Sequence, residues 1–398
     1  MTSSNIVFIR QIEDVDIKKI SKSTQNLTIS GGKTFYRSDE AIKLFGSKLT
    51  AFEFYEIKKY KRIYFVGQHA KKRINFDDEE DGVYSIVLHD HLDYRYEIIK
   101  PIGRGSFGNV VKAFDHKKHQ ADEEIKILDI LKKQDVKGGY NIIPMLEHFT
   151  FRNHKCITFK LLSMNLYELL KKNKFEGFRL TLVRKFAISI LHCLELLYLN
   201  KIIHTDLKPE NILLETPTSS SIKIADFGCS FFEGKKVYSY FQSRYYRAPE
   251  VILGGKIGMS LDMWSFGCIL AELLTGSVLL PGNNEGDQLA LMIELLGKPD
   301  EKFLEKVTRK NEFFNSKGKP IYCEEKKEKT ILKGGTRGKL RGAPGSKTWE
   351  DVLNDKGDEF FLDFLKLCLD WNPETRLTPI QAFKHPWLSR RLPFKKLD

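Results

Sequence analysis

The stretch from His204 to Asn211, with the sequence HTDLKPEN, constrains the fold of this chain more than any other feature. It places an aspartate, which can accept a proton, five residues before an asparagine, which can hold a metal ion. Asp226-Phe227-Gly228 follows fifteen residues after that asparagine, and Ala248-Pro249-Glu250 comes later. Each short motif alone also fits an ordinary polar turn. Their order and spacing together are typical of one two-lobed fold.

This arrangement resembles the catalytic core of the protein kinases. We therefore expect an α+β, bilobal protein-kinase fold with a small β-rich N-lobe and a large helical C-lobe. In this interpretation Asp206 is the catalytic base, and Lys208 offsets the negative charge that develops on the transferred phosphate. Asn211 and Asp226 would bind Mg²⁺, because that ion prefers amide and carboxylate oxygens.

A glycine-rich loop precedes these motifs and contains Gly103, Gly105 and Gly108. Glycines let the backbone approach phosphates closely, but this pattern also marks dinucleotide sites or simple turns. Here the loop lies between two predicted strands, 96–101 and 109–114, which favours the kinase loop over a strand–loop–helix site. We expect it to bind ATP together with Val110.

Composition limits the other function classes. Hydrophobic residues make up 41% and charged residues 29% of the 398 residues, as in folded soluble proteins. No apolar run approaches the length of a membrane span, and the N-terminus lacks signal-peptide character. The net charge of +13 is spread over scattered lysines, so we expect protein substrates, no specific nucleic acid, no membrane contact and a monomer. Six scattered cysteines favour the cytoplasm, with the nucleus as the alternative.

The chain divides into four predicted segments. Residues 1–38 are polar and predicted to be flexible, 39–93 form an N-terminal accessory region, 94–388 the kinase domain and 389–398 a basic tail. Residue patterns predict six further elements, which are helices over 39–54, 180–199, 261–274, 358–369 and 378–383 and a strand over 62–66. The stretch 311–347 is rich in Lys and Gly with weak periodicity, which predicts an irregular insert.

The segment 238–250, with the sequence YSYFQSRYYRAPE, resembles the activation segment of the dual-specificity tyrosine-phosphorylation-regulated kinases of the CMGC group. Residues 39–75 resemble the accessory region of the class II branch. The resemblance implies Ser/Thr phosphorylation of proteins and autophosphorylation of Tyr240. Its phosphate would pair with Arg244 and Arg247. It also implies that Phe159 is the gatekeeper and that Leu162 lies in the hinge that contacts adenine.

One part of the family pattern is missing. In the family, a strand with the pattern Val-Ala-x-Lys follows the glycine-loop hairpin, and its lysine pairs with a glutamate of the next helix. Here Glu124 matches that glutamate, but no such strand precedes it. About sixteen residues are absent, enough for one strand and a connection. Lys112 lies on the same predicted strand face as Val110 and is a weak substitute. We expect unpaired strand edges where the strand is lost.

Two functions therefore stay open. The first is an ATP-dependent, dual-specificity protein kinase that phosphorylates Ser/Thr and its own tyrosine. The second is a catalytically impaired pseudokinase that acts as a binding scaffold, or a truncated isoform or gene model of an active kinase.

Two further residues have predicted structural roles. Glu250 is expected to form a buried ion pair with Arg376, and Asp262 to anchor the catalytic loop.

Overall fold

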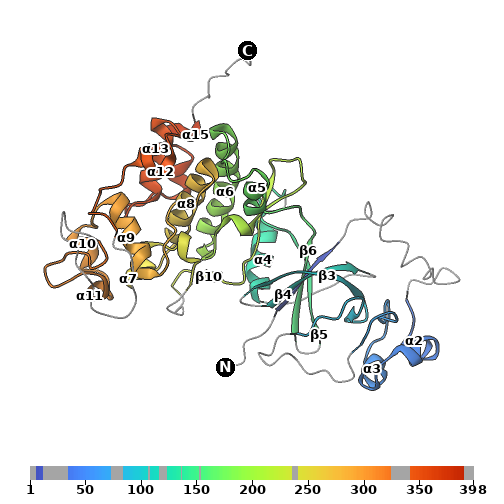
Figure 1. The fold of residues 1–398 in the computed structure, drawn as a ribbon. Helices are drawn as coiled ribbons and strands as arrows, with labels where there is room; N and C mark the ends of the chain where they lie inside the picture. The colour runs from blue at the N-terminus through green and yellow to red at the C-terminus, as the bar shows by residue number, and fades with distance from the viewer. Residues whose placement is uncertain are drawn as a thin grey trace, which may run out of the picture. The chain divides into compact units, whose positions relative to one another are not determined.

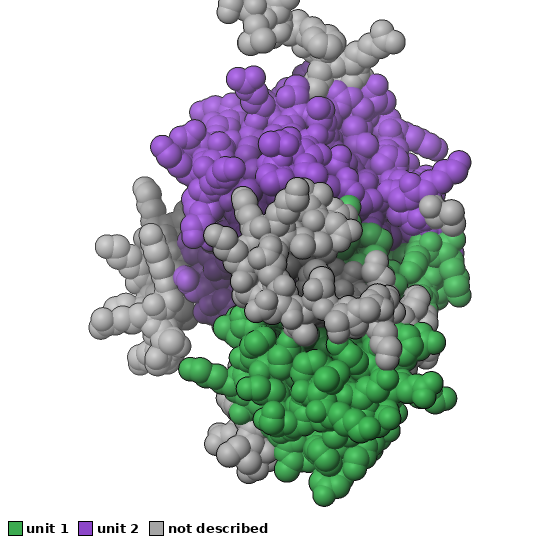
Figure 2. Space-filling view, turned by 90° about the vertical axis from the view of Figure 1, so that its right-hand side faces the viewer, with its two compact units in different colours: residues 1–133, 143–161 green, residues 134–142, 162–398 purple. Residues whose placement is uncertain are grey.

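The computed structural model describes residues 6–11, 35–72, 84–105, 108–115, 123–135, 137–151, 154–234, 241–323 and 341–389 (Figure 1). The chain forms two compact units, which are coloured separately in Figure 2. The first contains residues 1–133 and 143–161, and the second contains 134–142 and 162–398. The predicted α+β class is confirmed, with the larger sheet in the first unit and most helices in the second. None of the described helices is long and apolar enough to cross a membrane.

The first unit is built on one six-stranded sheet with the order β2-β3-β4-β1-β6-β5. Two antiparallel hairpins, β3–β4 and β5–β6, lie on either side of β1, which runs parallel to both of its neighbours. The strands are β1 (Ile6–Gln11), β2 (His91–Leu92), β3 (Tyr96–Gly105), β4 (Gly108–Asp115), β5 (Met145–Phe151) and β6 (His154–Lys160).

The position of β1 corrects two expectations. Residues 1–38 were predicted to be flexible, but Ile6–Gln11 form a strand (dark blue in Figure 1). The edges of β4 and β6 were predicted to be unpaired, but β1 pairs with both of them. The chain thus has a strand between these two hairpins, although the strand comes from the N-terminus.

One hydrophobic core of the first unit lies against one face of this sheet. Val111 and Ala113 of β4 are fully buried there, while the alternate residues Val110 and Lys112 are half-buried, as strand alternation predicts. Tyr96 stacks on Phe149 with ring centroids 5.1 Å apart. Helix α4 (Glu123–Gln134) buries apolar residues along one side, and its Lys132 Nζ donates a hydrogen bond to the Met145 carbonyl at 2.8 Å.

The accessory region forms two short helices where one was predicted. Helix α2 (Ser38–Phe45) ends in the 3₁₀ turn η2 (Gly46–Lys48), and α3 (Ala51–Glu56) then begins after the cap residue Thr50. Thr50 is extended, and its Oγ1 accepts a hydrogen bond from the Glu53 backbone N–H at 3.2 Å. This N-cap starts a new helix, so the apolar periodicity across 39–54 was a misleading signal. The predicted strand at 62–66 is also wrong, since only Ile63 forms a bridge, with Tyr36.

A buried cluster of charges holds the accessory helices to the sheet. The fully buried Glu53 accepts hydrogen bonds from Lys72 Nζ at 2.8 Å and pairs with His91 Nε2 at 2.9 Å. Tyr94 Oη donates to Glu56 at 2.8 Å. Burial alone would raise the pKa of Glu53, but His91 and Lys72 outweigh it and hold that pKa well below its usual range.

The second unit is mainly helical. Helix α6 (Leu180–Leu199) packs against α8 (Leu261–Thr275), as the apolar periodicity predicted, and every residue of α8 is buried. Two small antiparallel ladders, β7 (Ile202–Ile203) with β10 (Phe231–Phe232) and β8 (Ile212–Leu214) with β9 (Ile222–Ile224), flank the catalytic loop. The other helices are η3 (Ile57–Lys59) in the first unit, and α5 (Leu166–Lys172), η4 (Pro209–Asn211), η5 (Arg244–Tyr246), α7 (Pro249–Leu253), α9 (Glu285–Leu296), α10 (Glu301–Leu304), α11 (Lys310–Phe313), α12 (Trp349–Leu353), α13 (Glu359–Cys368), α14 (Pro379–Ala382) and α15 (Pro386–Ser389) in the second.

Candidate active site

The catalytic loop is fixed to the core of the second unit by Asp262 at the start of α8. Its two carboxylate oxygens accept hydrogen bonds from the backbone N–H groups of His204 at 2.7 Å and Thr205 at 3.0 Å. Thr205 has a φ of 68°, in the left-handed region, so these bonds hold a strained backbone in place. Burial raises the pKa of Asp262, although the N–H groups and His204 oppose the rise. The predicted anchoring role of Asp262 is confirmed.

Asp206 lies at the centre of a small polar cluster. Its Oδ2 accepts from Lys208 Nζ at 2.5 Å, and its Oδ1 accepts from the Ser243 hydroxyl at 2.7 Å and backbone N–H at 3.1 Å. Lys208 Nζ also reaches Ser243 Oγ at 3.2 Å. Burial lowers the pKa of Lys208, but the carboxylate of Asp206 outweighs this and raises it, so Lys208 stays charged at neutral pH. A carboxylate, a cation and a hydroxyl thus converge, as phosphoryl transfer to a hydroxyl requires.

Hydrogen bonds to the backbone position Asn211 and bring the segment of Asp226 next to it. Asn211 Nδ2 donates to the Asp206 carbonyl at 2.8 Å, which leaves the amide oxygen of Asn211 available to a cation. Its own carbonyl accepts from the Ala225 N–H at 2.8 Å, which brings the neighbouring Asp226 to the same part of the unit. Asp226 has a φ of 68°. The donor set, one amide oxygen and one carboxylate, fits Mg²⁺.

The glycine loop is placed as predicted, between two antiparallel strands. Gly103 pairs with Val110 and Gly105 with Gly108, at the end of the β3–β4 hairpin. A side chain at Gly103 would meet no atom within 4 Å. The backbone there borders open space, which suits a loop that lets phosphates approach it.

The remaining predicted ATP-binding residues belong to different elements of the two units. Phe159 is buried near the end of β6, and Leu162 is a buried residue at the start of the second unit. Glu124 lies in the first turn of α4. Their roles stay predictions, because the placement of one unit relative to the other is undetermined.

No lysine occupies the strand that lies between β4 and β6. In β1, Ile6 pairs with Gly108 and Phe8 with Val110, whereas the one cation of the strand, Arg10, pairs with Lys112. The apolar end of β1 is thus next to the glycine loop and the cationic end is away from it. Among the described residues, the strand between β4 and β6 therefore contains no lysine, and the Mg²⁺-binding roles of Asn211 and Asp226 stay predictions.

The activation segment is described only in part. Tyr240 lies outside the described residues. Arg247 is buried, with Nη1 donating to Glu285 at 2.9 Å and Nη2 to the Gln242 carbonyl at 2.7 Å. Arg244 Nη1 donates to the Asn283 carbonyl at 2.7 Å. A pairing of these arginines with phosphorylated Tyr240 stays a prediction.

Sequence analysis overlooked Ser243 and Gln242. Gln242 is buried with a φ of 64°, and its amide bonds the Ala248 N–H at 3.0 Å and Ser265 Oγ at 3.1 Å. It thereby fixes the backbone that points Ser243 at Asp206. The sequence signal that could have indicated these two residues is their position directly before the Arg-Tyr-Tyr-Arg sequence of the activation segment.

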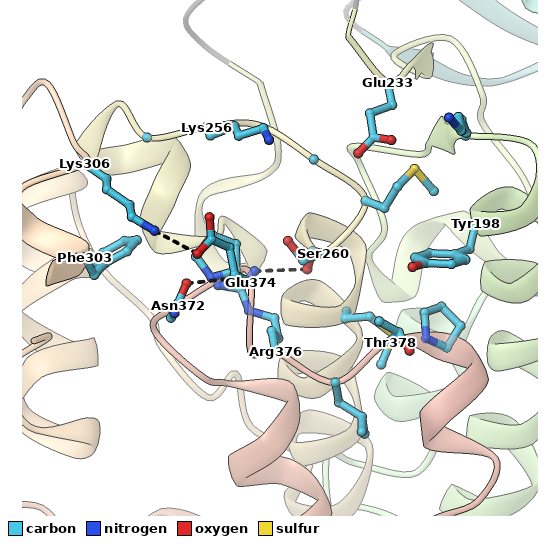
Figure 3. A pocket seen from close by; sticks show the side chains of 18 of the residues that line it. Tyr198, Glu233, Lys256, Ser260, Phe303, Lys306, Asn372, Glu374, Arg376 and Thr378 are labelled. Carbon is cyan, nitrogen blue, oxygen red and sulfur yellow. Dashed lines mark hydrogen bonds and ion pairs between the residues drawn. The ribbon is translucent and has the colours of Figure 1, made fainter.

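The predicted ion pair of Glu250 is confirmed. Arg376 Nη1 and Nη2 donate to its two oxygens at 2.6 and 2.8 Å, and both side chains are fully buried. Arg376 also lines a cavity of about 370 Å³ in the second unit, where Lys306 pairs with Glu374 at 2.7 Å (Figure 3). None of the predicted catalytic residues lines this cavity.

Comparison with known proteins agrees with this geometry. The family described as "Protein kinase domain" matches residues 96–388. The chain is 56% identical over 387 residues to the dual specificity tyrosine-phosphorylation-regulated kinase mbk-2 of Caenorhabditis elegans, covering 90% of this chain but 47% of that protein. It is 53% identical to human dual specificity tyrosine-phosphorylation-regulated kinase 3, covering 89% of this chain and 65% of that protein.

Human dual specificity tyrosine-phosphorylation-regulated kinase 4 is 45% identical, over 98% of this chain and 76% of the human protein. The chain spans about half the length of mbk-2 and larger shares of the two human relatives. The mbk-2 alignment is 387 positions long but covers only 90% of this chain's 398 residues, so it is longer than the part of this chain that it contains. The relative therefore has positions without a counterpart here, as a lost segment requires.

Proposed function

The chain belongs to the dual-specificity tyrosine-phosphorylation-regulated kinases, a family of the CMGC protein kinases, and on this basis we propose that it transfers phosphate from ATP to Ser and Thr hydroxyls of proteins after phosphorylating its own Tyr240. The observation that carries the proposal is the cluster of Asp206, Lys208 and Ser243. A hydroxyl already donates to Asp206 Oδ1 at 2.7 Å in this cluster. A substrate hydroxyl would take the same position.

The residues of the cluster have separate roles in this proposal. Asp206 orients the substrate hydroxyl and accepts its proton at Oδ1 as the oxygen is phosphorylated. Lys208, which remains charged, stabilises negative charge beside that oxygen. Asn211 and Asp226 would hold Mg²⁺, and Mg-ATP, when bound, supplies the phosphoryl group and neutralises part of its charge.

The missing lysine limits the activity that we expect. Loss of one preorganised charge donor typically costs ~10²–10³ in rate, equivalent to about 3–4 kcal/mol. β1 contains no lysine, and the backbone partner of its one cation, Arg10, is Lys112. This observation favours a second candidate function, in which the folded second unit binds partner proteins without transferring phosphate.

Phosphorylation of Tyr240 separates the two functions. The full chain is incubated with Mg²⁺ and ATP, and phosphate on Tyr240 is measured by mass spectrometry, with Asp206→Asn as the matched control. Phosphate on the parent chain and none on the control supports the kinase. If neither chain acquires phosphate while substrate peptides also stay unmodified, the scaffold function is favoured.

Nucleotide binding is tested separately by thermal shift. A site that binds Mg-ATP stabilises the fold by about 2.7 kcal/mol when ATP is a hundred times its Kd, so the unfolding temperature must rise. An unchanged unfolding temperature at millimolar Mg-ATP would exclude a working nucleotide site. Sequencing transcripts across codons 113–124 would show whether a longer form with the lysine strand exists.

We also propose that the protein acts as a monomer in the cytoplasm, with the nucleus as the alternative. Its six cysteines are all free thiols in the structure, which suits a reducing compartment. Fractionation of cells that express the tagged chain would test this location.

A further inference from the structure

We infer that the first unit contains a strand-binding slot between β4 and β6, and that the chain's own segment Ile6–Gln11 fills it in place of the strand that is absent after β4. The inference concerns how the sheet is completed and is independent of phosphoryl transfer. The slot restores the sheet but not the lysine.

The register shows that the segment is fully integrated into the sheet. All six residues of β1 have a partner on both sides, from Ile6 opposite Gly108 and Lys155 to Gln11 opposite Ala113 and Lys160. Without β1, the facing edges of β4 and β6 would present rows of unpaired N–H and C=O groups in the middle of the sheet. Such groups are costly when they are buried.

The sequence of the segment suits a central parallel strand. Strands of this kind are covered on both faces and are rich in Val, Ile and Phe, without polar alternation. Ile-Val-Phe-Ile matches this pattern and stands out from the polar residues of 12–34. The partners of β1 in the neighbouring strands also fit a central position. Val111 and Thr158, which are opposite Ile9, are fully buried, and so is Cys156, which is opposite Val7.

The connectivity of the chain permits the parallel direction. A parallel pair needs a long crossover connection, and the whole accessory region lies between the end of β1 and the start of β4. The strand that the kinase pattern places here follows β4 directly and would run antiparallel to it. The parallel direction places Ile6 opposite Gly108 and Arg10 opposite Lys112.

A native thiol allows the register to be tested with one substitution in the full chain. Val7 is directly opposite Cys156, a fully buried cysteine that forms no disulfide. Neighbouring strands lie about 4.8 Å apart, within the roughly 4.4–6.8 Å between Cα atoms that a disulfide spans. We expect Val7→Cys to form an intrachain disulfide with Cys156 under copper–phenanthroline oxidation, identified by mass spectrometry of the unreduced digest.

The matched control is Phe8→Cys, which moves the new thiol by one residue and therefore to the other face of the strand. The slot predicts at least a tenfold lower yield of the disulfide to Cys156 in this variant. Equal yields for the two variants, or no disulfide in either, would overturn the register. A disulfide between two chains would overturn the assignment of the segment to its own slot.

A second experiment tests whether the segment is needed to cover the slot. We expect Ile9→Asp to make Cys156 react with N-ethylmaleimide at least tenfold faster than in the parent chain, because position 9 pairs with the fully buried Val111 and Thr158 and an ionised side chain is costly at such a position of the sheet. Ile29→Asp, in the same N-terminal region, is the control and should leave the rate unchanged. Adding a peptide of residues 4–13 should restore protection to Ile9→Asp.

The readout is local, since Cys156 is in the first unit while all four tryptophans are in the second. An unchanged tryptophan unfolding curve shows that the second unit is still folded in Ile9→Asp. With that curve unchanged, equal labelling of Cys156 in the parent and Ile9→Asp chains refutes the slot. Faster labelling that the peptide reverses supports it.

Discussion

The buried pair of Glu250 and Arg376 offers the sharpest test of the energetics of the second unit. Both side chains are fully buried, so neither charge is solvated by water. The partners are not equivalent, however. Arg376 also donates to the carbonyls of Asp370 at 2.9 Å and Ser260 at 3.0 Å, and its guanidinium lies 5.2 Å from the ring centre of Trp264. Removing the arginine therefore takes away more than one ion pair.

Arg376→Met should be strongly destabilising, because it leaves the carboxylate of Glu250 buried without a cation. Breaking a buried pair in this way typically costs about 3–5 kcal/mol. Glu250→Gln should cost less, about 1–3 kcal/mol, because the arginine keeps its carbonyl acceptors and the amide oxygen can still accept. In Glu250→Leu/Arg376→Met both charges are gone, so the double variant should cost less than the sum of its single changes.

Urea unfolding followed by tryptophan fluorescence measures these changes in the right part of the molecule. All four tryptophans, including Trp264 beside Arg376, belong to the second unit.

Two results would refute this reasoning. The first is an Arg376→Met chain that unfolds within about 1 kcal/mol of the parent, which would mean that water reaches the pair. The second is strict additivity, in which the double variant loses as much stability as the two single variants together.

Two further predictions concern other buried carboxylates. Glu53 has a lowered pKa, so its pairs with histidine and lysine should stabilise the first unit at pH values above the unfolded-state pKa, and this stabilisation should be lost in acid. Glu53→Gln should lower the stability of the first unit at pH 7 by about 1–3 kcal/mol and flatten its acid dependence. Hydrogen exchange of the first unit measures both effects. Burial raises the pKa of Glu272 to about 7, although Tyr246 donates to it at 2.7 Å. The parent should therefore lose up to about 3 kcal/mol of stability as the pH rises from 4.5 to 7, whereas Glu272→Gln should not, as urea unfolding at both pH values would show.

The second unit was largely predictable because its motifs constrain one another. The sequence predicted that Asp262 would anchor the catalytic loop and that Glu250 would pair with Arg376, and the contacts confirm both. Helix α6 was equally predictable, since its apolar positions repeat with helical spacing over twenty residues. In each case the signal was a long periodic stretch or several linked motifs.

The first unit was harder to predict because its sheet depends on long-range pairing. The strand β1 is short, and its partners Gly108 and Lys155 are far away in the sequence, so no local signal points to them. The helix predicted over 39–54 failed for a different reason. Apolar spacing continues across Thr50, but the cap at that residue starts a second helix.

The central position of β1 also affects the order of folding. A sheet that adds its strands in chain order can assemble as it is synthesised, but this one closes only after β6, which ends at Lys160, is available to β1. Ile6 must then pair across a separation of about one hundred residues or more on both sides, and such non-local contacts form slowly. Until that step, the apolar strands β4 and β6 have open edges, so the nascent chain should need protection from aggregation during synthesis.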